Sequence, residues 1–247
     1  MGPRAVPPLT QPVEDYLKAI YELEQRDGTA GTSSVADALD VAPASVTGMV
    51  RKLAAQGLLD HMPYHGVSLT PLGRRAALRT IRRHRILESY LTQVLGVPWE
   101  TVHAEAERLE HAASDDLIER MAAALGHPTV DPHGAPIPTA AGEMDETRWQ
   151  SLAETAVGAQ VRVVQVRDRD PASLRALARC ALHPGAEVRI LARAARDGTL
   201  TVSHDGMTDQ VGPKLATQVL VEPMPVCADL PGLQPSLDAP LDSSIPT

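Results

Sequence analysis

The stretch from Pro43 to Thr70, PASVTGMVRKLAAQGLLDHMPYHGVSLT, decides the fold of the first part of this chain. Proline is favoured at the first position of a helix and glycine just after the last, so Pro43 and Gly57 predict a helix that runs to about Gln56. Two short apolar runs around a Pro/Gly turn then predict a β-hairpin over residues 58–70. A helix that leads directly into such a hairpin is typical of the second half of a winged helix-turn-helix.

Two shorter helices are expected upstream of this stretch. Apolar residues recur at helical spacing from Val13 to Gln25, and the run Thr32–Ser34 can cap a helix over Val35–Leu39. Three helices followed by a hairpin complete the winged helix-turn-helix layout.

The local charge is that of a surface that binds the phosphate backbone of DNA. The chain has a net charge of −8, yet residues 46–85 contain eight Lys or Arg and a single acidic residue, Asp60. A basic stripe of this kind attracts phosphates. A solvated helix face is the alternative interpretation of the charge alone.

The rest of the chain divides into a helical part and a β-rich part. Helices are predicted over residues 71–95, 99–112 and 114–125, and the Pro- and Gly-rich residues 127–147 follow as a linker or an ordered loop. From about Ala156, short β-type runs separated by turn signals predict a small all-β domain that contains one helix.

Length and composition exclude several classes of protein. At 247 residues the chain is long enough for two modest domains, and Cys180 and Cys227 are too few for a disulfide framework. We find no secretory segment, and no run of about 18 apolar residues that would span a membrane. We therefore expect a cytoplasmic protein with no membrane partner.

Histidine and carboxylate side chains gather on one face of the helix predicted over residues 99–112. At 100° per residue, four of them fall within about 100° of arc: His103, Glu107, Glu110 and His111. His84 and Glu88 are neighbours one turn apart on the preceding helix. Imidazole and carboxylate groups together are ligands for divalent cations, so these six residues beside a DNA-reading motif predict a metal sensor.

Three stretches carry a resemblance to a known family. They are Val13–Glu24 in the first helix, Ala44–Leu53 in the third helix, and Arg83-His84 together with the run from Val102-His103 to Glu110-His111. Together they resemble the diphtheria toxin repressor and manganese transport regulator family of metal-dependent regulators. The loop Pro132–Pro138 is similar to a segment that follows the family's dimerisation helices. The resemblance is strong over residues 10–140 and limited to the pattern of elements beyond them.

The resemblance implies a mainly α protein with an α+β portion. The implied segments are a winged helix-turn-helix domain (1–75), a helical metal-binding and dimerisation domain (76–145), a small SH3-like, FeoA-like β-barrel (146–223) and a tail expected to be disordered (224–247). The implied assembly is a homodimer that binds a palindromic DNA operator when it is loaded with metal.

The resemblance also implies two metal sites. The primary site would consist of Asp15, Glu107, Glu110 and His111. The ancillary site would consist of His84, Glu88 and His103, completed by a polar side chain of the SH3-like domain, for which the candidates are Gln165, Asp168 and Asp170. The remaining histidines are expected on the surface or in turns: His61, His65, His127, His133, His183 and His204.

Three positions in the sites bear on the choice of metal. Iron-responsive members carry Met and Cys where this chain has Asp15 and Glu107, and replacing sulfur with carboxylate favours Mn²⁺. Manganese regulators carry a second carboxylate in the first helix where this chain has Lys18, which disfavours their two-metal cluster and favours separate primary and ancillary sites. Fe²⁺ is the alternative effector, and Zn²⁺, Co²⁺ or Cd²⁺ are expected to substitute in vitro.

The third helix is expected to place its first turns in the major groove of double-stranded DNA. The side chains there are small, so we expect few base contacts from Ala44, Ser45, Thr47 and Gly48. Phosphate contacts are expected from Arg51, Lys52 and, in the wing, Tyr64. Shape and phosphate contacts would then supply much of the affinity.

The expected switch is a shift between two arrangements of the helices. Without metal the carboxylates would repel one another, and the first helix would move relative to the dimerisation helices. Mn²⁺ between Asp15 and the ligands on the later helix would remove that repulsion and fix the two reading heads of the dimer at the spacing of the operator. A coupling of about 1–3 kcal/mol is enough for such a switch.

Two other functions are compatible with parts of the pattern. One is an iron-responsive regulator, or one that activates an efflux gene. The other is a metal-dependent hydrolase, because the run from Glu107 to His111 resembles the inverted zinc-protease pattern, although its first ligand is Glu and not His. No Gly-rich phosphate loop or activated Ser or Cys accompanies this run, so we expect no enzyme activity and no small-molecule substrate.

Overall fold

The computed structural model describes residues 9–62, 66–167 and 170–224. Its first half contains the helices and the hairpin in the order α1 (Gln11–Asp27), α2 (Thr32–Leu39), α3 (Pro43–Ala55), β1 (Leu59–Met62), β2 (Gly66–Leu69), α4 (Pro71–Gln93), α5 (Val102–Leu109) and α6 (Asp115–Ala124). Its second half contains β3 (Gln150–Ser151), the 3₁₀ turn η1 (Leu152–Glu154), β4 (Gln160–Val166), α7 (Pro171–Arg179), β5 (Glu187–Arg193), β6 (Leu200–His204), β7 (Met207–Val211), α8 (Pro213–Ala216) and β8 (Val219–Pro223).

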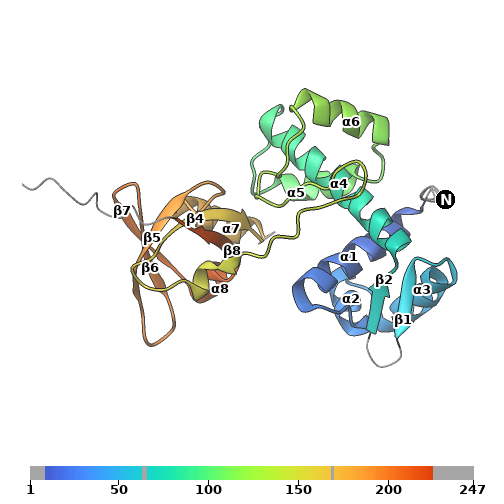
Figure 1. Ribbon diagram of the computed structural model, residues 1–247, viewed down its shortest axis with the longest axis horizontal. Helices are drawn as coiled ribbons and strands as arrows, with labels where there is room; N and C mark the ends of the chain where they lie inside the picture. The colour runs from blue at the N-terminus through green and yellow to red at the C-terminus, as the bar shows by residue number, and fades with distance from the viewer. Residues whose placement is uncertain (1–8, 63–65, 168–169, 225–247) are drawn as a thin grey trace, which may run out of the picture.

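The first five elements form the predicted winged helix-turn-helix (Figure 1). Pro43 occupies the first turn of α3, and β1 pairs antiparallel with β2. The inner face of α3 consists of Val46, Val50 and Leu53, which join one hydrophobic core with α1 and α4. The second helix begins at Thr32 and so includes the residues that we expected to cap it.

The long helix α4 leads from the winged domain into a layer with α5 and α6, as Figure 1 shows. Ile86 and Leu87 of α4 pack against Ala106 of α5 and Ile118 of α6. The helix α5 is shorter than predicted because Pro98 starts a turn: its carbonyl accepts hydrogen bonds from the N–H groups of residues 101 and 102. The helix also ends earlier than predicted, at Leu109, so Glu110 and His111 follow its last regular turn.

The C-terminal part is an antiparallel sheet in the order β3-β8-β4-β5-β6-β7. Alternate residues of β4 and β6, such as Val161, Val163 and Val202, point into its core. The strand β7 and the short helix α8 were not predicted, since polar residues fill most of β7. Among the described helices, none is long and apolar enough to cross a bilayer. The predicted tail, except Met224, lies outside the described residues.

The Pro- and Gly-rich segment 127–147 includes an ordered loop that joins the helical layer to the sheet. The N–H of Val166 in β4 donates a hydrogen bond to the carbonyl of His133, at 2.8 Å. Gly134 has a φ of +81°, and a Cβ atom there would lie 2.0 Å from the carbonyl oxygen of Val164. Only glycine allows this close approach. The contact brings β4 next to the residues of α4 and α5 that are predicted to bind metal.

Candidate metal centre

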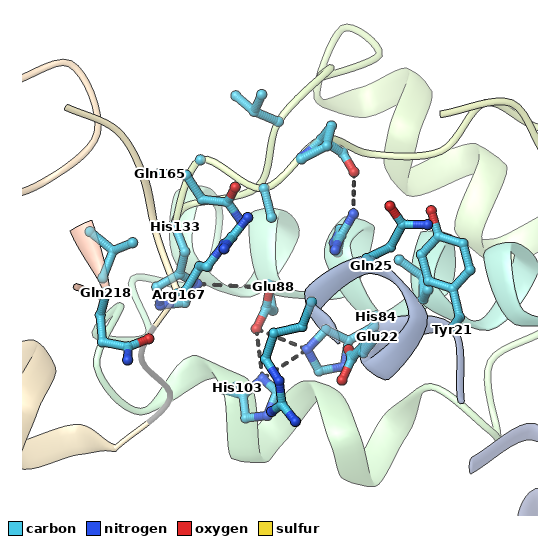
Figure 2. Close-up of a pocket in the computed structure, with 18 of the residues that line it drawn as sticks. Tyr21, Glu22, Gln25, His84, Glu88, His103, His133, Gln165, Arg167 and Gln218 are labelled. Atoms are coloured by element: carbon cyan, nitrogen blue, oxygen red, sulfur yellow. Dashed lines mark hydrogen bonds and ion pairs between the residues drawn. The ribbon is translucent and has the colours of Figure 1, made fainter. Parts of the chain in front are cut away.

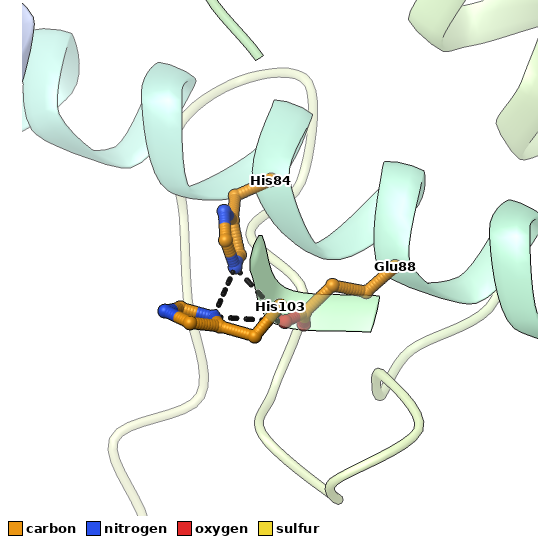
Figure 3. Close-up of side chains that lie close together, drawn as sticks. All are labelled: His84, Glu88 and His103. Atoms are coloured by element: carbon orange, nitrogen blue, oxygen red, sulfur yellow. Dashed lines mark hydrogen bonds and ion pairs between the residues drawn. The ribbon is translucent and has the colours of Figure 1, made fainter. Parts of the chain in front are cut away.

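The ligands predicted for the ancillary site lie together between α4 and α5. His84 Nε2 is 2.9 Å from Glu88 Oε1 and 2.9 Å from His103 Nδ1, and His103 Nδ1 is 3.1 Å from Glu88 Oε1 (Figure 3). Two ligands at right angles about one ion, with bonds of about 2.1 Å, lie about 3.0 Å apart. The spacing of these three atoms is thus that of donors around a single divalent cation.

A second set of donors joins α1 to the end of α5. Asp15, Glu110 and His111 each offer a ligand atom within 4.8 Å of the others. His111 Nε2 lies 2.8 Å from Asp15 Oδ1, while its Nδ1 lies 2.7 Å from Glu14 Oε2. Glu14 thereby orients the imidazole ring of His111. The sequence pattern did not predict this contact.

Glu107, the fourth residue expected in the primary site, lies between the two sets. It groups with His84 and Glu110 within 4.8 Å, and its Oε1 is 3.6 Å from His103 Nε2. Lys18 Nζ lies at 2.6 Å from Glu107 Oε1 and at 3.0 Å from both carboxylate oxygens of Glu110. The Lys18 ammonium offsets the expected repulsion between Glu107 and Glu110. The repulsion persists at Asp15, because the charges of Glu110 and Glu107 add to the effect of burial in raising the pKa of that carboxyl.

His84 connects the two sets. Its Nε2 faces Glu88 and His103, whereas its Nδ1 lies 2.5 Å from Glu110 Oε2. The sites that we expected to be separate thus adjoin through one imidazole ring.

The structure adds two donors that sequence reasoning placed elsewhere or missed. His133, expected on the surface or in a turn, is only 7% exposed, and it forms a compact group with Glu88 and Asp131. Its Nε2 lies 2.9 Å from the carbonyl oxygen of Trp99, and its ring stacks on the indole. The signal that could have found it is the Asp-x-His spacing in the loop. His133 does lie in a turn, as expected, but it is not on the surface. His204 lies in β6, is buried and pairs with Asp209, so the expectation of a surface or turn position is wrong for it.

Burial and charge shift the pKa values of these groups in opposite directions. Burial raises the pKa of Asp15, partly offset by the nearby His111. Burial also opposes ionisation of Glu88, but hydrogen bonds with His103, His133 and His84 together hold its pKa well below the ordinary range. Burial raises the pKa of Asp131 to about 6, and the charge of Glu88 adds to this shift. The centre therefore holds Glu88 as a carboxylate, the form that binds a cation.

The candidates from the β domain differ in where they lie. Gln165 lines the cleft of about 1810 Å³ that also contains His84, Glu88, His103 and His133 (Figure 2). Asp170 lines the same cleft, but its side chain accepts a hydrogen bond from Ser173 N–H and caps α7. Asp168 lies outside the described residues.

The expected DNA-facing residues share the outer face of α3. The exposed positions are Ala44, Ser45, Thr47, Gly48, Arg51 and Lys52. The hydroxyl of Thr47 donates to the carbonyl of Pro43 at 3.2 Å, within the same helix. Tyr64 lies outside the described residues.

The donor sets fit a divalent cation by their chemistry. Mixed imidazole and carboxylate ligands suit Mn²⁺, Fe²⁺ and Zn²⁺. The set of Asp15, Glu110 and His111 and the set of His84, Glu88 and His103 each bring such ligand atoms within 4.8 Å of one another. The His84, Glu107 and Glu110 set is different, because Lys18 already provides its positive charge.

Comparison with family models divides the chain into three matches. Residues 8–67 match the N-terminal DNA-binding domain of iron-dependent repressors. Residues 70–139 match the metal-binding and dimerisation domain of the same repressors, and residues 150–223 match the FeoA domain.

Individual relatives agree with these matches. The chain is 31% identical to the diphtheria toxin repressor of Corynebacterium diphtheriae over 225 residues, which cover 87% of this chain and 98% of the relative. It is 39% identical to the iron-dependent repressor IdeR of Mycobacterium tuberculosis over 130 residues, 53% of this chain and 56% of the relative, so that match spans little more than half of IdeR.

Solved structures are similar over most of the chain. A manganese-dependent transcriptional repressor in complex with manganese superposes with a TM-score of 0.80 at 39% identity, covering 86% of this chain and all of that one. The manganese regulator SloR superposes with a TM-score of 0.71 at 32% identity, covering 86% and 98%. The predicted fold class and resemblance are confirmed: the chain belongs to the diphtheria toxin repressor and manganese transport regulator family of metal-dependent repressors.

Proposed function

We propose that this protein is a manganese-responsive transcriptional regulator, a homodimer that binds a palindromic operator when loaded with metal and represses metal-transport genes. We assign it to the cytoplasm and assign it no catalytic step. The proposed domains are residues 1–75, 76–145 and 146–223, with residues 224–247 as a tail.

The observation that carries the proposal is the position of the Asp15, Glu110 and His111 set. Asp15 belongs to α1, which packs in the core of the winged domain, while the other two residues follow α5 in the helical layer. A divalent ion held by all three would supply a strong electrostatic link between the DNA-reading unit and the helices proposed to dimerise. The carboxylate at Asp15 supports Mn²⁺ over Fe²⁺, because hard oxygen ligands suit Mn²⁺.

These residues have distinct tasks in the proposed switch. Asp15 binds the ion from α1, and Glu110 and His111 bind it from the end of α5, so the ion couples the positions of the two helices. The His84, Glu88 and His103 set ties α4 to α5 and stiffens the layer on which the winged domain rests. Lys18 links α1 to α5 without metal, so an ion bound by the Asp15 set would tighten an arrangement that is already linked. The ion would also relieve the repulsion of Asp15 by Glu107 and Glu110.

The proposal is tested with Asp15→Ala and His111→Ala, which each remove one ligand of the set. We expect both variants to lose Mn²⁺-stimulated operator binding, measured by fluorescence anisotropy, while circular dichroism and light scattering report an unchanged folded dimer. Glu187→Ala, an exposed carboxylate of β5, is the matched control and should respond like the wild type. An unchanged Mn²⁺ response in both site variants would defeat the proposal.

The same titration separates the competing effectors. Titrating the wild type with Mn²⁺, Fe²⁺ and Zn²⁺ at equal free concentration gives the preference directly. Activation by Fe²⁺ at free concentrations where Mn²⁺ has no effect would assign the protein to the iron-responsive members instead.

A further inference from the structure

Lys18 is a buried cation inside a set of metal-type donors. The residue is 7% exposed, and its ammonium lies 2.6 Å from Glu107 Oε1, 3.0 Å from each oxygen of Glu110 and 3.3 Å from His84 Nδ1. These three partners are themselves a group whose ligand atoms lie within 4.8 Å of one another. The ammonium therefore stands where a cation bound to this group would stand.

An ion and the ammonium cannot share these donors. A small divalent cation binds oxygen at about 2.1 Å and needs the same lone pairs that Lys18 uses. Two positive charges about 4 Å apart also repel by several kcal/mol at the dielectric constant of a partly buried site. The two remaining sets each share one residue with the group around Lys18: Glu110 belongs also to the set with Asp15 and His111, and His84 belongs also to the set with Glu88 and His103.

We propose that Lys18 is a built-in cation that limits the α1 side of the centre to one divalent ion and lowers the affinity of that ion. Glu110 belongs both to the group that Lys18 fills and to the set with Asp15 and His111, so metal entry must draw Glu110 away from the ammonium. This inference rests on the proposed function only in taking the Asp15 set as a metal site.

The decisive variant is Lys18→Glu, which replaces the cation with a further ligand. We expect it to bind one more Mn²⁺ per protomer than the wild type, counted by equilibrium dialysis and metal analysis. The added ion would lie next to the first, so electron paramagnetic resonance should show two exchange-coupled Mn²⁺ ions in place of the hyperfine pattern of isolated ones. Lys18→Arg keeps the charge and should keep the wild-type count, as should Lys214→Glu, an exposed lysine of α8.

A second variant keeps the test valid if Lys18→Glu does not fold. Lys18→Met retains the length of the side chain without its charge, and we expect it to bind the first Mn²⁺ at least about tenfold more tightly by calorimetry. An unchanged affinity in Lys18→Met, or an unchanged count and spectrum in a folded Lys18→Glu, would overturn the proposal.

Operator binding in the same samples separates this inference from the proposed function. A wild-type protein that binds Mn²⁺ but not the operator would overturn the proposed function and leave the assignment of Lys18 intact. If the wild type binds the operator in response to Mn²⁺, but Lys18→Glu does not raise the number of Mn²⁺ ions bound per protomer, the assignment of Lys18 is overturned and the proposed function stands.

Discussion

At the scale of single residues, Glu14 decides how His111 can act. One carboxylate oxygen of Glu14 faces His111 Nδ1, and the other accepts a hydrogen bond from Arg83 at 3.1 Å. Arg83 in turn pairs with Asp115 at the start of α6. The ring is thus held with Nε2 directed at Asp15, the orientation in which an imidazole serves a metal shared with that carboxylate.

Glu14→Gln should weaken Mn²⁺ binding without removing a ligand. We expect a 10- to 100-fold loss of affinity by calorimetry, the range typical of residues that orient a metal-binding histidine. Glu105→Gln, which alters an exposed pair with Arg108 on α5, should leave the affinity unchanged. Equal affinity in both variants would show that the ring is oriented without Glu14.

At the scale of elements, α3 has an outer face built from small residues. A Cβ atom at Gly48 would meet nothing within 4 Å, so no contact inside the protein requires glycine there. Glycine in the middle of a helix costs about 0.5–1 kcal/mol relative to alanine. A glycine at this position would let the backbone of α3 approach the DNA more closely than alanine would, which offers a reason for the cost in stability.

Gly48→Ala should therefore separate stability from binding. We expect the free energy of unfolding to rise by about 0.5–1 kcal/mol in urea titrations, because alanine favours the helix. Operator affinity should fall in the same variant, measured by anisotropy at fixed salt. The control is Gln56→Ala at the C-cap of α3, which also places alanine on this element but far from the turns expected to meet DNA, and it should keep the operator affinity of the wild type. Full operator affinity in Gly48→Ala would remove α3 from the DNA interface.

At the scale of the whole molecule, the helical layer presents apolar side chains that the single chain leaves uncovered. Leu109, the last residue of α5, is 41% exposed, and Leu117 of α6 is 43% exposed. Val94 and Leu95, just after α4, are exposed as well. Exposed apolar residues in the segment that matches a dimerisation domain are the natural contact between two copies.

Leu117→Glu should turn the proposed dimer into a monomer, because a carboxylate in an apolar interface loses its hydration. Size-exclusion chromatography with light scattering gives the mass directly, and operator binding should weaken because one reading head replaces two. Met207→Glu alters a more exposed apolar side chain in the β domain and should leave the dimer intact. A dimeric Leu117→Glu would place the interface elsewhere.

The sequence by itself determined the features that depend on neighbours along the chain. Helical spacing put His84 and Glu88 one turn apart on α4, and Pro43, Gly57 and the Pro/Gly turn specified the winged domain, since helical periodicity, caps and turns are local. Only the tertiary structure decided which donors meet. Lys18 reaches His84 across 66 residues, and Glu14 reaches His111 across 97, distances over which periodicity carries no information. His133 lies in a turn, as its composition predicts, but only the packing of that turn against β4 brings the ring beside Glu88. The reason is that a metal centre depends on contacts between elements and not on any one of them.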